Sequence, residues 1–169
     1  MSLHYSMLAS VTLFQGLDLD ELQALINVVE IRDYKADENL FVEGDPGGLL
    51  MIVVSGSVEI FIYGENNTPI VLNTIQAGGF FGEVSLFDGS RRSTNAVARG
   101  ATQVATLNRE VMVDFLHKHP SAAINIITVL SKRLRDATSL IGHREANAYE
   151  LLHEKLKRAT SSRILPVEH

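Results

Sequence analysis

Apolar residues change their spacing twice along the chain, and these changes divide it into three parts. From Ser10 to Val29 they recur every three or four residues, which predicts an amphipathic helix or a pair of helices. Asp18 and Asp20 precede the main apolar run, a position typical of an acidic helix N-cap. The apolar positions are Leu13, Phe14, Leu17, Leu22, Leu25, Ile26 and Val29. Residues 1–30 are therefore predicted to form an N-terminal helical segment.

From about Ile31 to Leu107 the pattern changes to short stretches rich in β-branched and aromatic residues. Gly, Asn, Asp and Pro gather between these stretches, as turns require. The stretches span residues 39–42, 50–54, 57–63, 70–75 and 95–107. Many short strands at close spacing favour an antiparallel β-roll or jelly-roll barrel, which limits exposed strand edges. Residues 31–110 are therefore predicted to form this β-roll, in a mainly β fold with flanking helices.

Helical spacing returns at Glu110, and Pro120 suits the start of a fresh helix that runs to about Ala159. Two rows of residues in this helix each repeat every seven positions, and they form an a/d stripe. The rows are Ile127, Leu134, Ile141 and Ala148, and Leu130, Ala137, Arg144 and Leu151. Residues 110–159 are thus predicted to be C-terminal helices, followed by a flexible tail at 160–169.

The stripe has two interpretations. An amphipathic helix that packs on its own barrel produces the same pattern. The stripe is, however, too long to lie wholly on one small barrel, so the pattern favours a helix whose outer part pairs with a second copy. The chain is then a homodimer joined through its C-terminal helix.

Composition excludes several classes of function. A chain of 169 residues is long enough for one well-buried core. No apolar run approaches the roughly 20 residues that cross a bilayer, and no signal peptide is evident, so we expect a cytoplasmic protein without membrane contact. The absence of cysteine excludes disulfides and iron–sulfur clusters. A net charge of −5 argues against DNA binding by this chain alone.

The histidines argue against an enzyme. A cupin-type enzyme needs two or three histidines that converge on a metal inside its barrel, and none of the six lies in the β part of this chain. His117 and His119 are two residues apart, so they point to different faces of a helix. We therefore predict no catalytic residues, no metal site and no cofactor.

Residues 80–98, here called the cassette, combine a candidate anion site with a carboxylate. They read F-F-G-E-V-S-L-F-D-G-S-R-R-S-T-N-A-V-A, a short helical segment between two β stretches. Gly82 lets the backbone approach a ligand, and the following helical turn presents free N–H groups to a phosphate. Arg92 suits the phosphate charge, and Glu83 suits a sugar hydroxyl. Taken singly, however, Glu83 also suits a helix N-terminus, and Arg92 a surface partner such as Asp88.

The cassette resembles the phosphate-binding cassette of the cyclic nucleotide-binding domain, which is shared by the catabolite activator family, protein kinase A regulatory subunits and cyclic nucleotide-gated channels. The family pattern is F-G-E, a small residue and Leu, then Arg followed by Ser, Thr or Ala. This sequence supplies Phe81-Gly82-Glu83, Ser85-Leu86 and Arg92-Ser93, and upstream Phe41-x-x-Gly44-Asp45 and Gly56-Ser57-Val58. The resemblance covers roughly residues 14–141.

The resemblance implies a sensor or regulatory domain that binds cAMP, or less favourably cGMP, and signals through movement of its C-terminal helix. Glu83 would hold the ribose 2′-hydroxyl and Arg92 the exocyclic phosphate oxygens. Ser93, with backbone N–H groups near Val84 and Ser85, would complete the cradle, and Leu72 would sit against the base. Arg91, where many relatives have proline, is expected to be a solvated surface charge.

The base and the output are less specified. Relatives of the catabolite activator contact adenine with a threonine on the long helix, where an alignment places Ala137. Thr138 follows, and it reaches the base only after a one-residue shift or from a partner subunit; otherwise it is a solvated surface residue. Ser93, directly after Arg92, does not exclude guanine as the base of the bound nucleotide. Related transcription factors add a winged helix-turn-helix, so the chain is either a stand-alone sensor or an excerpt. The alternative function is a ligand-free dimerisation or regulatory module excerpted from a larger regulator.

Overall fold

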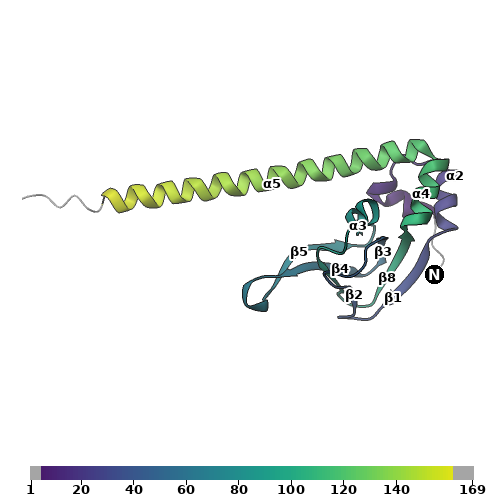
Figure 1. Cartoon of the computed structure of the whole chain (residues 1–169), viewed down its shortest axis with the longest axis horizontal. Helices are drawn as coiled ribbons and strands as arrows, with labels where there is room; N and C mark the ends of the chain where they lie inside the picture. The colour runs from purple at the N-terminus through teal and green to yellow at the C-terminus, as the bar shows by residue number, and fades with distance from the viewer. Residues whose placement is uncertain (1–4, 162–169) are drawn as a thin grey trace, which may run out of the picture. The chain divides into compact units, whose positions relative to one another are not determined.

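The computed structural model describes residues 5–161, with side chains described for residues 5–139 and for residue 150. Two β-sheets are flanked by helices at both ends of the chain (Figure 1). The chain divides into two compact units, Met1–Ile127 and Thr128–His169. All strands of the described residues, and the candidate site, belong to the first unit. The predicted tail at 160–169 lies almost wholly outside the described residues.

The N-terminal segment consists of short helices: α1 (Tyr5–Ser10), a 3₁₀ turn η1 (Thr12–Phe14) and α2 (Leu19–Ile26). Asp18 is the N-cap of α2. Its carboxylate accepts the backbone N–H of Glu21 at 2.8 Å, and the Glu21 carboxylate accepts that of Asp18 at 2.9 Å. This reciprocal pair is a capping box, which confirms the predicted acidic N-cap. Gly16, at φ +89°, turns the chain between η1 and α2.

In the part of the chain that the structure describes, eight strands form two antiparallel sheets of four. One sheet has the order β1 (Glu30–Tyr34), β8 (Thr102–Asn108), β3 (Leu49–Ser55) and β6 (Phe80–Phe81). The other has the order β2 (Asn39–Phe41), β7 (Asn95–Ala98), β4 (Ser57–Tyr63) and β5 (Pro69–Gln76). A 3₁₀ turn, η2 (Glu65–Asn67), links β4 to β5. The mainly β fold with flanking helices is confirmed, and the strands double into two sheets without closing into one barrel.

One predicted stretch contains two strands. Residues 95–107 were expected to be continuous, but the chain turns at Gly100, whose φ of +95° suits glycine. β7, before the turn, pairs with β2 and β4, whereas β8, after it, pairs with β1 and β3. The stretch therefore crosses from one sheet to the other, and this places residue 95 and the end of the cassette in the second sheet.

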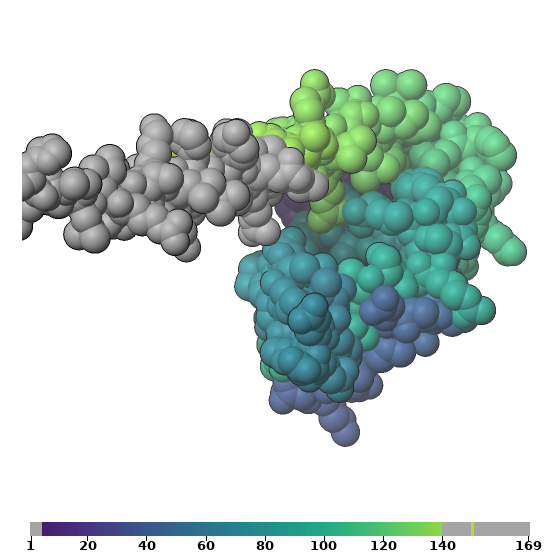
Figure 2. All heavy atoms as spheres, turned by 60° about the vertical axis from the view of Figure 1, so that its left-hand side comes forward, coloured from purple at the N-terminus to yellow at the C-terminus, as the bar shows by residue number. Residues whose placement is uncertain are grey.

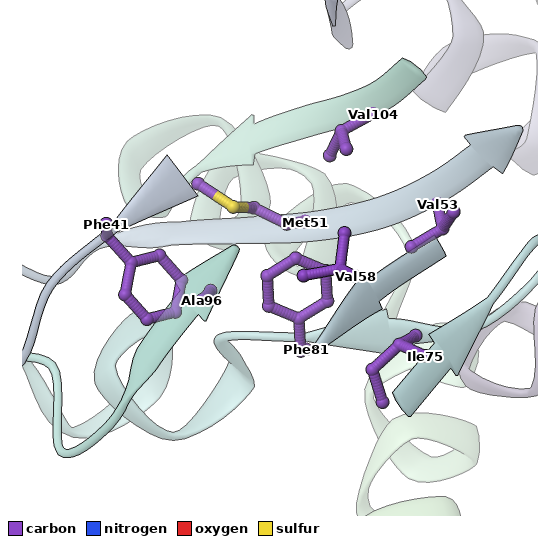
Figure 3. Packing of buried hydrophobic residues seen from close by; sticks show 8 residues of the cluster. All are labelled: Phe41, Met51, Val53, Val58, Ile75, Phe81, Ala96 and Val104. Atoms are coloured by element: carbon purple, nitrogen blue, oxygen red, sulfur yellow. The ribbon is translucent and has the colours of Figure 1, made fainter. Parts of the chain in front are cut away.

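The core lies between the two sheets. Each sheet contributes four residues to one buried cluster, shown in Figure 3: Met51, Val53, Phe81 and Val104 from the first sheet, and Phe41, Val58, Ile75 and Ala96 from the second. Side chains of alternate strand positions meet in this way when two sheets pack face to face. The cassette leaves this core at Phe81 and returns to it at Ala96.

Within residues 5–161, two helices follow β8. α4 (Arg109–Lys118) is capped by Asn108, which accepts the backbone N–H of Val111 at 2.9 Å. α5 (Pro120–Ser161) begins at the proline, as predicted. The Ser121 hydroxyl donates to Glu21 of α2 at 2.9 Å, which joins the start of α5 to the N-terminal helices. Within the described residues, no helix combines the length and apolar character needed to cross a membrane.

The β4–β5 hairpin carries exposed apolar side chains. β5 is an edge strand of its sheet, and Ile70, Val71 and Leu72 are each about half exposed. Tyr63, at the end of β4, is also half exposed. In Figure 2 this hairpin, in blue-teal, projects at the surface. The predicted base contact, Leu72, therefore lies on an accessible edge strand.

Candidate functional site

The cassette folds as a short helix between two left-handed glycines. Gly82, at φ +83°, precedes α3 (Glu83–Asp88), and Gly89, at φ +74°, follows it. A Cβ atom built on Gly82 would lie 2.5 Å from Nη1 of Arg92 and 2.7 Å from the Leu49 carbonyl oxygen. Both the backbone conformation and the missing side chain are thus needed here. Gly82 allows a close approach by Arg92 of the same chain.

The Arg92 guanidinium is buried and held by three protein oxygens. Only 5% of Arg92 is exposed. Nη1 donates to Ser85 Oγ at 2.8 Å and, at 3.4 Å, to the Gly82 carbonyl, and Nη2 donates to the Leu49 carbonyl at 2.8 Å. Its Nε–H is buried and has no hydrogen-bond partner. One donor of the fork therefore remains unsatisfied inside the protein.

The loop after β2 fixes the Arg92 backbone. The Arg92 N–H donates to the Asp45 carbonyl at 2.9 Å, and the Gly44 N–H donates to the Arg92 carbonyl at 2.8 Å. The Asp45 carboxylate in turn accepts the Val42 N–H at 2.9 Å, which shapes the loop. Gly47 packs so closely that an added Cβ would lie 2.5 Å from the Ser85 Cβ. The two backbone hydrogen bonds between Arg92 and Gly44-Asp45 explain physically why a Gly-Asp turn accompanies the cassette.

Arg92 carries a charge that its surroundings neutralise only in part. Burial lowers the pKa of the Arg92 guanidinium, and the nearby Asp45 and Glu83 carboxylates act in the opposite direction with a smaller effect. Among the described residues, none of the ion pairs includes Arg92. A buried cation without a paired carboxylate is unfavourable until an anion joins it.

The alternative interpretation, in which Arg92 forms a surface ion pair with Asp88, is wrong. Asp88 instead accepts the backbone N–H of Ser90 at 2.8 Å, which closes the turn after α3. The cation near this turn is Arg109, whose Nη1 donates to the carbonyls of Leu86 and Phe87.

The remaining predicted residues vary in their surroundings. Glu83 is half-buried at the start of α3, Val84 is 60% exposed, and Ser93 is exposed. Thr138 belongs to the second unit, where its hydroxyl donates to the Leu134 carbonyl at 2.9 Å. Gly82, Ser85 and Arg92 thus contact one another directly. No hydrogen bond of the described residues joins Leu72 or Ser93 to that group.

Two neighbours of Arg92 are absent from the sequence prediction. The Leu49 carbonyl is a backbone group, so its residue type gives no signal. Phe41 lies 51 positions from Arg92, yet the Arg92 Cζ lies 4.3 Å from the centroid of its ring. The motif Phe41-x-x-Gly44-Asp45 contains this residue, but spacing alone does not indicate what its side chain contacts.

Arg91 is exposed at the surface, and its Nη1 donates to the Gly44 carbonyl at 2.7 Å.

A family model described as cyclic nucleotide-binding domain matches residues 31–119. This range includes the loop after β2, the cassette and both sheets. The chain belongs to the cyclic nucleotide-binding domain family. The match confirms the resemblance that the cassette motifs indicated.

Three comparisons describe this cyclic nucleotide-binding domain further. It is 32% identical to the cyclic AMP receptor protein of Thermus thermophilus over 93% of the chain and 74% of that protein. The crystal structure of the Thermus thermophilus catabolite activator protein aligns with a TM-score of 0.72 and 32% identity, over 77% of this chain and 61% of that one. The regulatory domain of Toxoplasma gondii PKA with cAMP gives a TM-score of 0.67 and 26% identity, over 78% of this chain and 48% of that one.

The domain thus spans less than two thirds of the length of both crystallised relatives. The family model describes a binding domain and the Thermus relative is a receptor, neither of which is an enzyme. This confirms the prediction that the chain is not an enzyme. Within the described part of the chain, no three His, Asp or Glu residues are grouped as metal ligands.

Proposed function

We propose that this domain binds cAMP, with cGMP as the less favoured ligand, and that Arg92 holds the phosphate. The observation that supports this most strongly is the buried Arg92 guanidinium, which takes part in none of the ion pairs of the described residues. A buried cation without a counter-ion is unfavourable, so this group suits an anionic oxygen. A cyclic phosphate supplies such oxygens together with one negative charge.

The residues around Arg92 suit the rest of a cyclic nucleotide. Glu83 lies at the start of α3, where its carboxylate can accept the ribose 2′-hydroxyl. The N–H groups of Val84 and Ser85 lie in the first turn of α3 and have no acceptor within that helix, so they can donate to phosphate oxygens. Ser93 follows Arg92 directly and is exposed, which leaves its hydroxyl free to complete the cradle.

Adenine is the favoured base. One relative is a cyclic AMP receptor protein, and one structural neighbour was crystallised with cAMP. We place Leu72 against the base because half of its surface is accessible on β5. Thr138 is the candidate for an adenine contact, from its own chain or from a partner.

We further propose that the domain is a homodimer joined through α5, and that ligand binding moves this helix. Three large apolar residues of α5 support pairing, since Ile124, Ile127 and Leu134 are 65%, 58% and 70% exposed. The a/d positions Ile141, Arg144, Ala148 and Leu151 lie outside the described side chains. Such a signal requires that the nucleotide bind two helix placements with different affinity. With its net charge of −5, the chain alone is not expected to bind DNA.

Calorimetric titration with cAMP, cGMP and 5′-AMP tests the binding proposal. We expect the wild-type protein to bind cAMP most tightly. Arg92→Ala and Glu83→Ala should each remove a charge-assisted contact worth about 1.5–3 kcal/mol, or roughly 10- to 150-fold in Kd. Arg92→Lys keeps the charge but loses the fork, so it should also bind weakly.

Arg91→Ala is the matched control, because it removes the same charge from the adjacent, exposed position. It should change the Kd far less than Arg92→Ala does. Equal losses in the two variants would reduce the role of Arg92 to general electrostatics. If none of the three nucleotides binds, the dimerisation or regulatory module becomes the better function.

A further inference from the structure

Phe41 meets the Arg92 guanidinium from the side of the core. It ends β2, is 9% exposed, and lies 4.3 Å from the Arg92 Cζ, measured to the ring centroid. Figure 3 shows its ring at one end of the buried cluster, beside Ala96. The ring of Phe81, 6.1 Å away and tilted by 43°, packs against it. The position of the Phe41 ring is therefore fixed by the core.

The contacts of the guanidinium divide into two kinds. Ser85, Gly82 and Leu49 bind the two Nη atoms through hydrogen bonds, and these restrain rotation of the group in its own plane. The Phe41 ring covers the group at Cζ, and this restrains its tilt. Neither kind of contact uses the Nε–H.

We propose that Phe41 is a positioning residue of the phosphate site, which holds the Arg92 guanidinium in the orientation that binds the phosphate. This inference rests on the proposed binding of a cyclic nucleotide. The negative face of an aromatic ring attracts a guanidinium electrostatically, and more strongly when water is excluded. The ring therefore stabilises the buried cation and its orientation without using any of its N–H donors.

A carboxylate in the place of Phe41 would act differently. It would neutralise Arg92 and occupy two of its donors, and the ligand phosphate would then have to displace it. The ring adds no negative ion, so it does not neutralise the charge that attracts the ligand. This explains why a cation can be held in the interior while it still attracts an anion.

Two substitutions at position 41 separate the electronic role of the ring from its packing role. Phe41→Leu keeps an apolar side chain but removes the ring. Pentafluorophenylalanine at position 41 keeps a ring of nearly the same shape but removes its negative face. We expect each to raise the Kd for cAMP by about tenfold in calorimetry. Phe41→Tyr, which keeps the electron-rich face, should restore binding to near the wild-type value.

Two controls report on packing alone. Val58 is fully buried in the same cluster, so Val58→Ala should lower the melting temperature but leave the Kd unchanged. Pentafluorophenylalanine in place of Phe14, a buried ring of η1, makes the same chemical change in a different part of the core and should also leave the Kd unchanged.

A spectroscopic signal adds a readout that does not require ligand. The Arg92 Nε–H resonance of the free protein should be shifted by the ring current of Phe41, and Phe41→Leu should remove this shift. The inference is overturned if Phe41→Leu and the pentafluorophenylalanine variant at position 41 both fold and bind cAMP as the wild-type protein does while Arg92→Ala does not. If the wild-type protein itself binds no cyclic nucleotide, the proposed function fails with it.

Discussion

At the scale of single residues, the glycines in and near the cassette are needed because neighbouring residues fill the space that a side chain would take. Gly82 has no side chain because Arg92 Nη1 and the Leu49 carbonyl fill that space. Gly47 lacks one because Ser85 and Ser90 lie there. The motif residues therefore build the pocket of the arginine as well as the proposed site of the nucleotide. A substitution at either glycine is expected to displace Arg92 before it affects any ligand contact.

Asp88 makes the turn after α3 sensitive to acid. The pKa of its carboxyl group is lowered from the ordinary value of 3.8, first by the hydrogen bond from the Ser90 side chain and then by that from the Ser90 backbone, with a smaller contribution from Arg109. A lowered pKa means that Asp88 contributes stability above pH 3.8 and loses it as the pH falls through the folded-state value. The turn should therefore be intact at neutral pH. NMR titration of the Asp88 carboxyl carbon measures this directly.

Ser90→Ala removes the hydroxyl, so the pKa of Asp88 should rise toward its ordinary value. Ser90→Thr keeps the hydroxyl and should leave the pKa low. A pKa of Asp88 that is the same in all three proteins would show that the Ser90 side chain does not stabilise the carboxylate.

At the scale of elements, caps and short apolar stretches were predictable, while pairing was not. The Asp18 N-cap and the Pro120 start follow from local chemistry, and both are confirmed. The break at Gly100 was missed because apolar residues continue on both sides of it, although the two strands pair in different sheets. β1 was missed because four of its five residues are exposed and its strand state depends on pairing with β8.

In the candidate site, too, local motifs were predictable and contacts between distant segments were not. The motif order indicated Gly82, Ser85 and Arg92, which the structure brings into contact. Their neighbours Phe41 and Leu49 come from other strands, so only the folded chain reveals them.

Glu21 connects two helical elements and predicts a loss of stability. One carboxylate oxygen accepts the Asp18 N–H, and the other accepts the Ser121 hydroxyl and lies 3.6 Å from Nδ1 of His119. Because Glu21 is 7% exposed, Glu21→Ala leaves these donors without a partner. We expect the free energy of unfolding to fall by about 1–3 kcal/mol, measured by urea denaturation.

Asp20→Ala serves as the control, since Asp20 is exposed in the same helical turn and should cost less than about 1 kcal/mol. In a double-mutant cycle, Ser121→Ala should show coupling with Glu21→Ala. Additive effects of the two substitutions would argue that this hydrogen bond contributes little.

At the scale of the whole molecule, pairing through α5 and its movement can be tested with spin labels. The chain contains no cysteine, so Lys132→Cys and Lys35→Cys each introduce a single reactive thiol at an exposed position. A label at position 132 alone should give a distance between protomers if α5 pairs with a second copy. Protein labelled at both positions and diluted with unlabelled protein should change its distance distribution when cAMP binds.

Absence of any distance for the single label would contradict pairing through this part of α5. An unchanged distribution in the double-labelled protein would contradict helix movement as the signal, even if the nucleotide binds.

The position of β8 also has a consequence during synthesis. Among the described residues, β8 is the last strand in chain order and the only strand that pairs with β1, yet it lies between β1 and β3. Thr106 even donates to the Glu30 carbonyl, 76 residues earlier. While the ribosome is still translating the codons before residue 102, β1 has no strand to pair with and one edge of β3 is open. The sheet is completed only when β8 has left the exit tunnel. A nascent chain that stalls earlier therefore exposes unpaired strand edges, to which chaperones or other unfolded chains can bind.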